Sequence, residues 1–141
     1  MATAYKFNKA IENIGNGIVN LGTHTLKVML VNGYTYDATD DAKADVGSVE
    51  IANGNGYTTG GATLAGVSFT YNAGFTRLDA NDVVWTAASG NIGPATGAII
   101  YSDTAANKNV LFYYDFGQSE TAGEDTDFKI TFNVNGIIAF N

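Results

Sequence analysis

Short runs rich in β-branched and aromatic residues recur along the chain from residue 25 onward, and glycine, asparagine or aspartate separates each run from the next. Several runs alternate between two faces, as half-buried strands do. With 17 glycines and one proline, the turns between them must depend on Gly, Asn and Asp. At 141 residues the chain has room for one ordinary domain. We therefore predict a single mainly β domain over residues 1–141, an antiparallel β-sandwich or a jelly-roll-like relative. The predicted strands lie within residues 25–31, 62–71, 82–87, 97–102, 109–116 and 127–134.

One helix is expected at the N-terminus. Apolar residues recur there at steps of four, three, four and three, which places them on one helical face. Two internal glycines weaken this helix by roughly 1 kcal/mol each, so it must rely on packing. The prediction is a helix within residues 7–20. Its apolar face would consist of Phe7, Ile11, Ile14, Ile18 and Leu21.

The C-terminal segment carries the clearest hairpin signal. Phe128, Ile130, Phe132 and Val134 alternate with polar residues, and Asn135-Gly136 then leads into a second apolar run. Asn-Gly between two such runs favours a type I′ turn, because both central residues need positive φ. The sequence predicts a β-hairpin that turns at this dipeptide.

Composition excludes several classes of partner and site. The formal net charge of −7 argues against nucleic acid and anionic membranes, which require a basic surface. With no cysteine, the chain has no disulfide, thiolate zinc site or thiol nucleophile. We see no signal peptide and no apolar run that could span a membrane. Only 15% of residues are charged, which suits a surface that packs against other protein.

The glycine-rich stretch at residues 50–64, EIANGNGYTTGGATL, raises the question of a phosphate-binding loop. A dinucleotide-binding loop requires a strand, G-x-G-x-x-G and then a helix, but here the spacing differs and a strand-like run follows. A P-loop would need G-K-[ST], which is missing. We interpret the stretch as turns between strands.

Candidates for acid–base chemistry or metal binding are few. His24 is the single histidine and no G-x-S-x-G motif accompanies it, so a hydrogen-bonded structural role is favoured. Asp37, Asp40, Asp41 and Asp45 could attract a calcium ion, but their spacing is not that of an EF-hand. We expect residues 33–48 to form a long, exposed, solvated loop. The chain is predicted not to be an enzyme, with no catalytic residue, cofactor or metal.

Tyrosine is favoured where a side chain is half buried at a protein interface, and the chain has eight. Residues 1–6 have no apolar period of their own, so we expect a neighbouring chain to hold this arm. The candidate interface residues are Tyr5 in the arm and Tyr34 and Tyr36 in the following loop.

The order of motifs resembles that of a family of small virion structural proteins of tailed bacteriophages. The resemblance runs from YKFNKAIENIGNGIVNLGTHTLKVMLVN through EIANGNGYTTGGATL and VVWTAASGNIGPATGAIIYSDTAANKNVLFYYDFG to FKITFNVNGIIAF, and omits the acidic loop. It implies a structural role in the particle.

Within the particle we favour a capsid decoration, or cement, protein that binds the outer shell and bridges capsomers to stabilise the head. Its expected partners are the major capsid protein and two further copies of itself in a homotrimer, with the protein made in the host cytoplasm. The alternative is a receptor- or carbohydrate-binding module associated with a tail or head fibre.

Overall fold

Antiparallel strands make up most of the structure. The computed structural model describes residues 3–140. Two helices, α1 (Asn8–Gly15) and α2 (Lys43–Val46), and one 3-10 turn, η1 (Gly47–Val49), accompany the strands. The strands are β1 (Thr3–Lys6), β2 (Leu26–Val31), β3 (Ala62–Thr63), β4 (Ser68–Asn72), β5 (Phe75–Asp79), β6 (Val83–Thr86), β7 (Ile92–Ser102), β8 (Val110–Ala122), β9 (Asp127–Ile130) and β10 (Ile138–Phe140).

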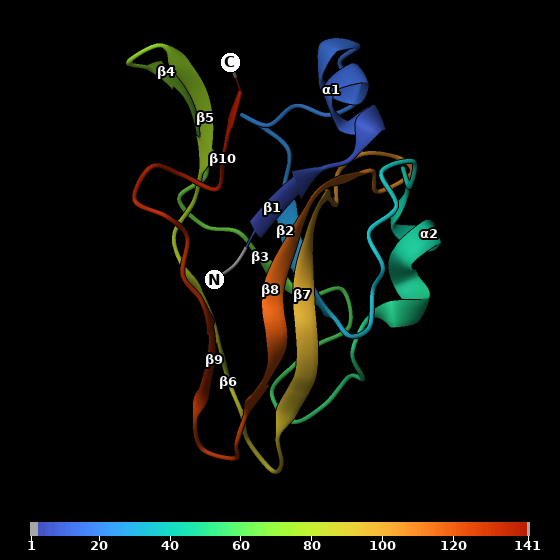
Figure 1. Cartoon of the computed structure of the whole chain (residues 1–141), viewed down its shortest axis with the longest axis vertical. Helices are drawn as coiled ribbons and strands as arrows, with labels where there is room; N and C mark the ends of the chain where they lie inside the picture. Colours follow the sequence, from blue (N-terminus) through green and yellow to red (C-terminus); the bar gives the residue numbers. More distant parts are fainter. Residues whose placement is uncertain (1–2, 141) are drawn as a thin grey trace.

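The strands form one large sheet and two small ones. The large sheet has the order β1-β8-β7-β2-β3, and the small ones are β10-β5-β4 and the two-stranded ribbon β6-β9. Figure 1 shows the large sheet in the middle of the molecule, with the two small sheets following each other along one side and α2 on the other. All strand pairs within residues 3–140 are antiparallel. The predicted mainly β, antiparallel, sandwich-like architecture is confirmed.

Aromatic side chains on β8 join the large sheet to the small ones. Because side chains alternate along a strand, every second residue of β8 points toward the small sheets. Three of these are aromatic and each meets a partner across the gap. The ring centroids lie 5.9 Å apart for Phe112 and Phe140, 6.1 Å for Tyr114 and Phe132, and 6.1 Å for Phe116 and Phe128.

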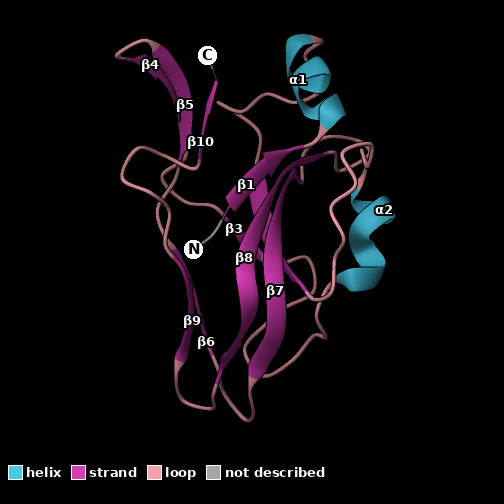
Figure 2. Cartoon of the chain, in the orientation of Figure 1, coloured by secondary structure: helices cyan, strands magenta, loops and turns pink. Residues whose placement is uncertain are grey.

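Strand β2 is buried on both faces. Its sequence alternates as a half-buried strand would, yet Val28, Met29, Leu30 and Val31 are all fully buried. The strand lies between β7 and β3 in the large sheet, and Figure 2 shows helix and loop segments on the side of that sheet away from the small sheets. Burial on both faces explains why apolar residues occupy nearly every position.

Helix α1 is shorter than predicted, and only part of the predicted apolar face is buried. It ends at Gly15, and Gly17 has φ +75°, a conformation that glycine adopts at low cost. The N–H groups of Ile18 and Val19 then bond the Asn13 carbonyl at 2.9 and 3.1 Å. Ile18 is therefore outside the helix and exposed, and Ile11 is exposed on the helix itself. Ala10 and Asn13 are the buried residues of α1, and the predicted Phe7, Ile14 and Leu21 pack into or against the core.

The predicted C-terminal hairpin is wrong. Strand β9 pairs with β6, and β10 pairs with β5, so the two strands belong to different sheets. Asn135-Gly136 does form a turn, with Gly136 at φ +99°. The next residue, Ile137, donates its N–H to the Leu78 carbonyl at 2.8 Å, which directs the chain onto β5. Strand β9 ends early because the Phe132 N–H bonds the Asp82 carboxylate at 3.0 Å instead of a strand partner.

Two further segments differ from the prediction. Residues 62–71 form two strands in different sheets, β3 and β4, separated by a bend in which Gly66 has φ +65°. Residues 33–48 contain α2 and the first part of η1 rather than one featureless loop. In that segment Asp45 accepts hydrogen bonds from the N–H groups of Asp41 and Ala42 at 3.1 and 2.9 Å, which fix the start of α2.

Candidate functional site

The glycine-rich stretch is folded around a carboxylate of the chain itself. The Glu50 side chain is nearly buried, and its Oε1 accepts hydrogen bonds from the Tyr57 hydroxyl at 2.8 Å and from the Gly60 N–H at 2.5 Å. Lys43 Nζ lies 3.6 Å from its other oxygen. A backbone N–H that a phosphate would need is therefore already bonded internally.

Gly61 explains why glycine is required at the end of this stretch. Its φ is +80°, and a Cβ atom there would lie 1.8 Å from the Val28 carbonyl oxygen. The chain then enters β3 rather than a helix. The stretch turns the chain, as the sequence indicates.

His24 is held by a buried serine. Its Nδ1 lies 2.9 Å from Ser102 Oγ, which also accepts the Ala105 N–H at 3.1 Å. Ser102 is fully buried at the end of β7. The expected hydrogen-bonded environment of His24 is confirmed.

The acidic segment exposes Asp37 and Asp45 to solvent, as expected, but its carboxylates also bond the chain itself. Asp37 accepts the side-chain and backbone donors of Thr39, which hold the pKa of its carboxyl below the usual range. The backbone donors that Asp45 accepts lower its pKa in the same way. Asp41 Oδ1 accepts two buried amides, from Asn13 at 2.8 Å and Asn109 at 3.0 Å. Within residues 3–140, no three His, Cys, Asp or Glu side chains are arranged to hold a metal.

The structure brings the three candidate interface tyrosines together. Tyr5 stacks on Tyr36 with ring centroids 4.9 Å apart, and both rings lie 6.0 Å from that of Tyr113 on β8. Tyr34 meets Tyr113 edge-on at 4.9 Å and donates its hydroxyl to Asp40 at 2.7 Å. Tyr34 and Tyr36 are half buried, and burial raises the pKa of both. Tyr5 is the exposed edge of this tyrosine cluster.

The expectation that a neighbouring chain holds the N-terminal arm is wrong for residues 3–6. Strand β1 pairs with β8 of the same chain, with Tyr5 opposite Tyr113. The Phe7 N–H continues this pairing to the Leu111 carbonyl at 3.2 Å. The first two residues of the predicted arm lie outside the described residues.

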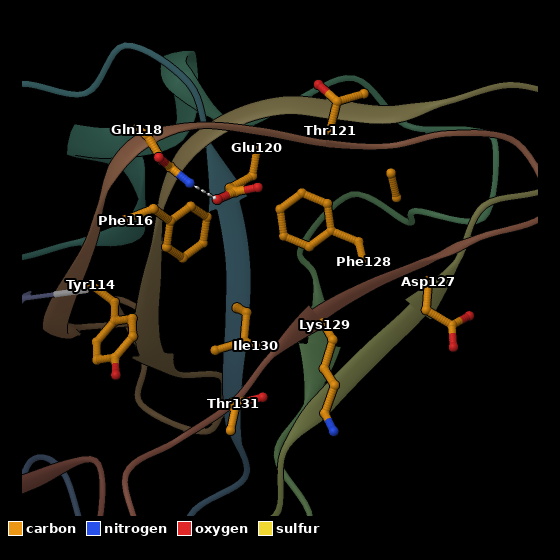
Figure 3. A pocket seen from close by; sticks show the side chains of 11 residues that line it. Tyr114, Phe116, Gln118, Glu120, Thr121, Asp127, Phe128, Lys129, Ile130 and Thr131 are labelled. Carbon is orange, nitrogen blue, oxygen red and sulfur yellow. Dashed lines mark hydrogen bonds between the residues drawn. The ribbon is translucent and has the colours of Figure 1, made fainter. Parts of the chain in front are cut away.

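A cleft that the sequence analysis did not identify lies between β8 and β9 (Figure 3). Its volume is about 410 Å³, within the range of roughly 300–1,000 Å³ that is typical of small-ligand sites. Aromatic and polar side chains share its walls. The residues that line this β8–β9 cleft are Tyr114, Phe116, Gln118, Glu120, Thr121, Ala122, Asp127, Phe128, Lys129, Ile130 and Thr131.

A large bulge in β8 shapes one wall of the cleft. Asp115 lies opposite Gly97 and Glu120 opposite Ala95, so five residue steps of β8 face two of β7. Gly117 at φ +75° lies within this bulge. Within it, Gln118 Nε2 donates to Glu120 Oε1 at 2.6 Å, the bond drawn in Figure 3.

The charges around the cleft are predominantly acidic. Two acidic residues, Glu120 and Asp127, and one cation, Lys129, line it, and Lys129 Nζ lies 3.5 Å from an oxygen of Asp82. Asp127 accepts the Thr86 hydroxyl at 2.8 Å, which fixes its carboxylate at the rim. The cleft therefore favours neutral or cationic ligands over anions.

A second surface feature is the end of the β4–β5 hairpin, which projects at the upper left of Figure 1. Ala73 and Gly74 both have positive φ, so the turn is of the type I′ kind. Around it, Tyr71 is 75% exposed, Phe75 is 37% exposed and Arg77 lies 5.3 Å from the Phe75 ring centroid. We call Tyr71, Ala73, Gly74 and Phe75 the hairpin tip.

No family model, curated protein or solved structure matches the chain. Among residues 3–140, the helices are too short and too polar to cross a membrane.

Proposed function

We propose that the protein is a structural component of a bacteriophage virion, a decoration protein that binds the outer face of the capsid shell and bridges neighbouring capsomers. The observation that carries the proposal is the hairpin tip. It presents large aromatic side chains to solvent at the projecting end of the small sheet β10-β5-β4 (Figure 1). The order of sequence motifs, which resembles that of small virion structural proteins, supplies the biological setting.

The hairpin tip has the composition of an interface core. Tyrosine and phenylalanine are enriched where protein surfaces meet, and charged residues are depleted there. The tip contains Tyr71 and Phe75 and no charged residue. A short projecting hairpin can enter a recess on a partner, which in this proposal is the major capsid protein.

The tyrosine cluster is a second contact. Tyr5 is exposed on the edge strand β1, and Tyr36 and Tyr113 hold its ring in place from behind. An aromatic residue that is already ordered loses little conformational entropy when it binds. The hairpin tip and the tyrosine cluster together give each copy two contacts, as bridging between capsomers requires.

Many weak contacts suffice for this role. A trimer uses each contact three times, and its effective concentration at the lattice raises the avidity well above the affinity of one site. His24 bonds the buried Ser102 hydroxyl within the fold, which favours a structural role for this side chain.

A binding assay on particles tests the proposal. Heads that lack the protein are mixed with the purified chain and sedimented, and we expect the wild type to sediment with them. Tyr71→Ser combined with Phe75→Ser should weaken binding by about tenfold or more, because aromatic interface residues dominate binding energy. The control is Ile11→Ser, which removes an exposed apolar side chain from α1. If the double variant bound particles as well as Ile11→Ser does, the hairpin tip would not be the contact with the capsid.

Labelled protein should also map to the head surface in images of the intact particle. Location at the tail tip would replace the decoration role by adhesion to the host. Particles without the protein should release DNA at lower temperature than complete particles.

A further inference from the structure

The second half of β8 places polar side chains where a sandwich normally has apolar ones. Phe112, Tyr114 and Phe116 point toward the small sheets, and Gln118 and Glu120 continue on the same cleft-facing side. The residues facing inward between two packed sheets form the core and are usually apolar. Gln118 and Glu120 bond each other at 2.6 Å and line the β8–β9 cleft instead of filling it.

Aromatic rings lie beside these polar groups. Phe116 is half buried, so part of its ring is open to the cleft, and Phe128 lies opposite with the centroids 6.1 Å apart (Figure 3). The face of an aromatic ring is electronegative and attracts the weakly positive C–H bonds of a pyranose ring. A ring face beside a carboxylate and an amide is therefore suited to a sugar, which has an apolar C–H face and a rim of hydroxyl groups.

The Glu120 carboxylate has one oxygen that can accept a hydrogen bond from a ligand. Gln118 bonds Oε1 of Glu120, and Oε2 has no hydrogen-bond partner among residues 3–140. A charged acceptor bound to a ligand hydroxyl forms one of the stronger hydrogen bonds available to a protein. Glu120 is also exposed, so no burial of its charge has to be offset before a ligand arrives.

The bulge in β8 argues against an added peptide strand as the occupant. An extended peptide needs a regular row of unpaired N–H and C=O groups along the strand edge. Five residue steps of β8 face two of β7 at this place, and Gly117 has positive φ, so the row is interrupted. Bulges of this kind re-aim side chains and protect strand edges from pairing.

We propose that the β8–β9 cleft binds a short neutral oligosaccharide, with Phe116 against one sugar face and Glu120 and Gln118 on its hydroxyl groups. The acidic rim formed by Glu120 and Asp127 disfavours sugars that carry carboxylate or sulfate groups. The proposal is independent of where the protein lies in a particle, because it depends on the cleft alone.

An array of neutral and acidic glycans tests the class of ligand. The wild-type chain should bind one or more neutral glycans and none that differ only by an added carboxylate or sulfate. A soluble neutral oligosaccharide from the positive set is then titrated against isotopically labelled protein. The amide signals of Phe116, Gln118, Glu120 and Lys129 should shift on binding.

Matched variants separate recognition from folding. Glu120→Ala should weaken binding of that oligosaccharide by about tenfold or more, the usual effect of losing a charged hydrogen-bond acceptor. Gln118→Ala should weaken it several-fold, which keeps the test valid if the first variant unfolds. The control is Glu124→Ala, which also removes one carboxylate. Glu124 lies four residues after Glu120 and does not line the cleft, so this variant should bind as the wild type does.

Three results would overturn the proposal. They are no binding to any neutral glycan of the array, equal loss of binding in Glu120→Ala and Glu124→Ala, and amide shifts that avoid the cleft. Shifts of the cleft amides with an extended peptide of alternating valine and lysine, and with no glycan, would assign the cleft to peptides instead.

Discussion

The two halves of strand β8 differ in the polarity and burial of their inward side chains, although both halves face the small sheets. Residues 110–116 lie between β1 and β7, and their inward aromatic side chains meet partners on β9, β10 and the segment between them. Residues 117–122 have no β1 beside them, and two of their cleft-facing side chains, Gln118 and Glu120, are polar and exposed. The change falls at the bulge that contains Gly117.

This difference assigns fold stability to the first half of β8 and ligand recognition to the second half. A buried aromatic side chain stabilises the fold through apolar area and close packing. A polar side chain at the open end of the sandwich contributes little to stability, so it is free to serve a ligand. Substitutions in the first half should change stability, and substitutions in the second half should change binding.

The largest effect is expected at Phe112, which is fully buried. Phe112→Ala should lower the free energy of unfolding by about 3–5 kcal/mol, because it removes an aromatic side chain from a packed core and leaves a cavity. Gln118→Ala, six residues later on the same face, should change it by less than about 0.5 kcal/mol. Urea unfolding followed by tryptophan fluorescence measures both, since Trp85 is buried.

The variants must be compared at equal slope of the unfolding curve, because a change in slope signals a change in the denatured state. If Gln118→Ala lowered the free energy of unfolding as much as Phe112→Ala does, both halves of β8 would belong to one core. The proposed division of β8 would then be wrong.

The first half of this contrast could be predicted from the sequence. The aromatic and β-branched run at residues 109–116 indicates a strand, and the density of such runs indicates an antiparallel sandwich. The local pattern shows which residues form strands because side-chain alternation is a property of neighbouring positions. The extension of β8 to Ala122 was missed because polar residues at Gln118 and Glu120 remove the apolar alternation.

Strand partners were harder to predict than strands. The Asn135-Gly136 dipeptide formed its turn but not a hairpin, because β5 and β6 were better partners for the flanking segments. The β8–β9 cleft could not be predicted for the same reason, since its walls come from strands that do not pair with each other.

A smaller effect should appear at high pH. Burial, and then the nearby charge of Asp115, raise the pKa of Tyr113, and burial raises that of Tyr114. In the unfolded chain a tyrosine ionises near pH 10, so both states are protonated below about pH 10 and the full stability is present there. Above it the unfolded state loses protons that the folded state keeps. The free energy of unfolding should then fall by up to about 1.4 kcal/mol per pH unit for each such tyrosine.

Tyr114→Phe tests this dependence in the first half of β8. Replacing the hydroxyl removes the titrating group, so the loss of stability between about pH 10 and 11 should become shallower than in the wild type. Gln118→Ala, which removes no ionisable group, should keep the wild-type slope. Parallel curves for Tyr114→Phe and the wild type would show that this tyrosine ionises equally in both states.

The smallest change in stability is expected from a substitution that extends the apolar face into the second half of β8. Gln118→Leu places an apolar side chain next to Phe116 and Phe128, so it should raise the free energy of unfolding by about 0.5 kcal/mol. The same substitution removes the amide from the cleft and should weaken neutral oligosaccharide binding several-fold, as Gln118→Ala does. Thermal unfolding and glycan titration on the same sample measure the two effects. A gain in stability with a loss of binding is the trade-off expected where a polar residue is present for a ligand. If Gln118→Leu instead lowers stability by more than about 1 kcal/mol, the bond from Gln118 to Glu120 holds the bulge in shape, and both halves of β8 serve the fold.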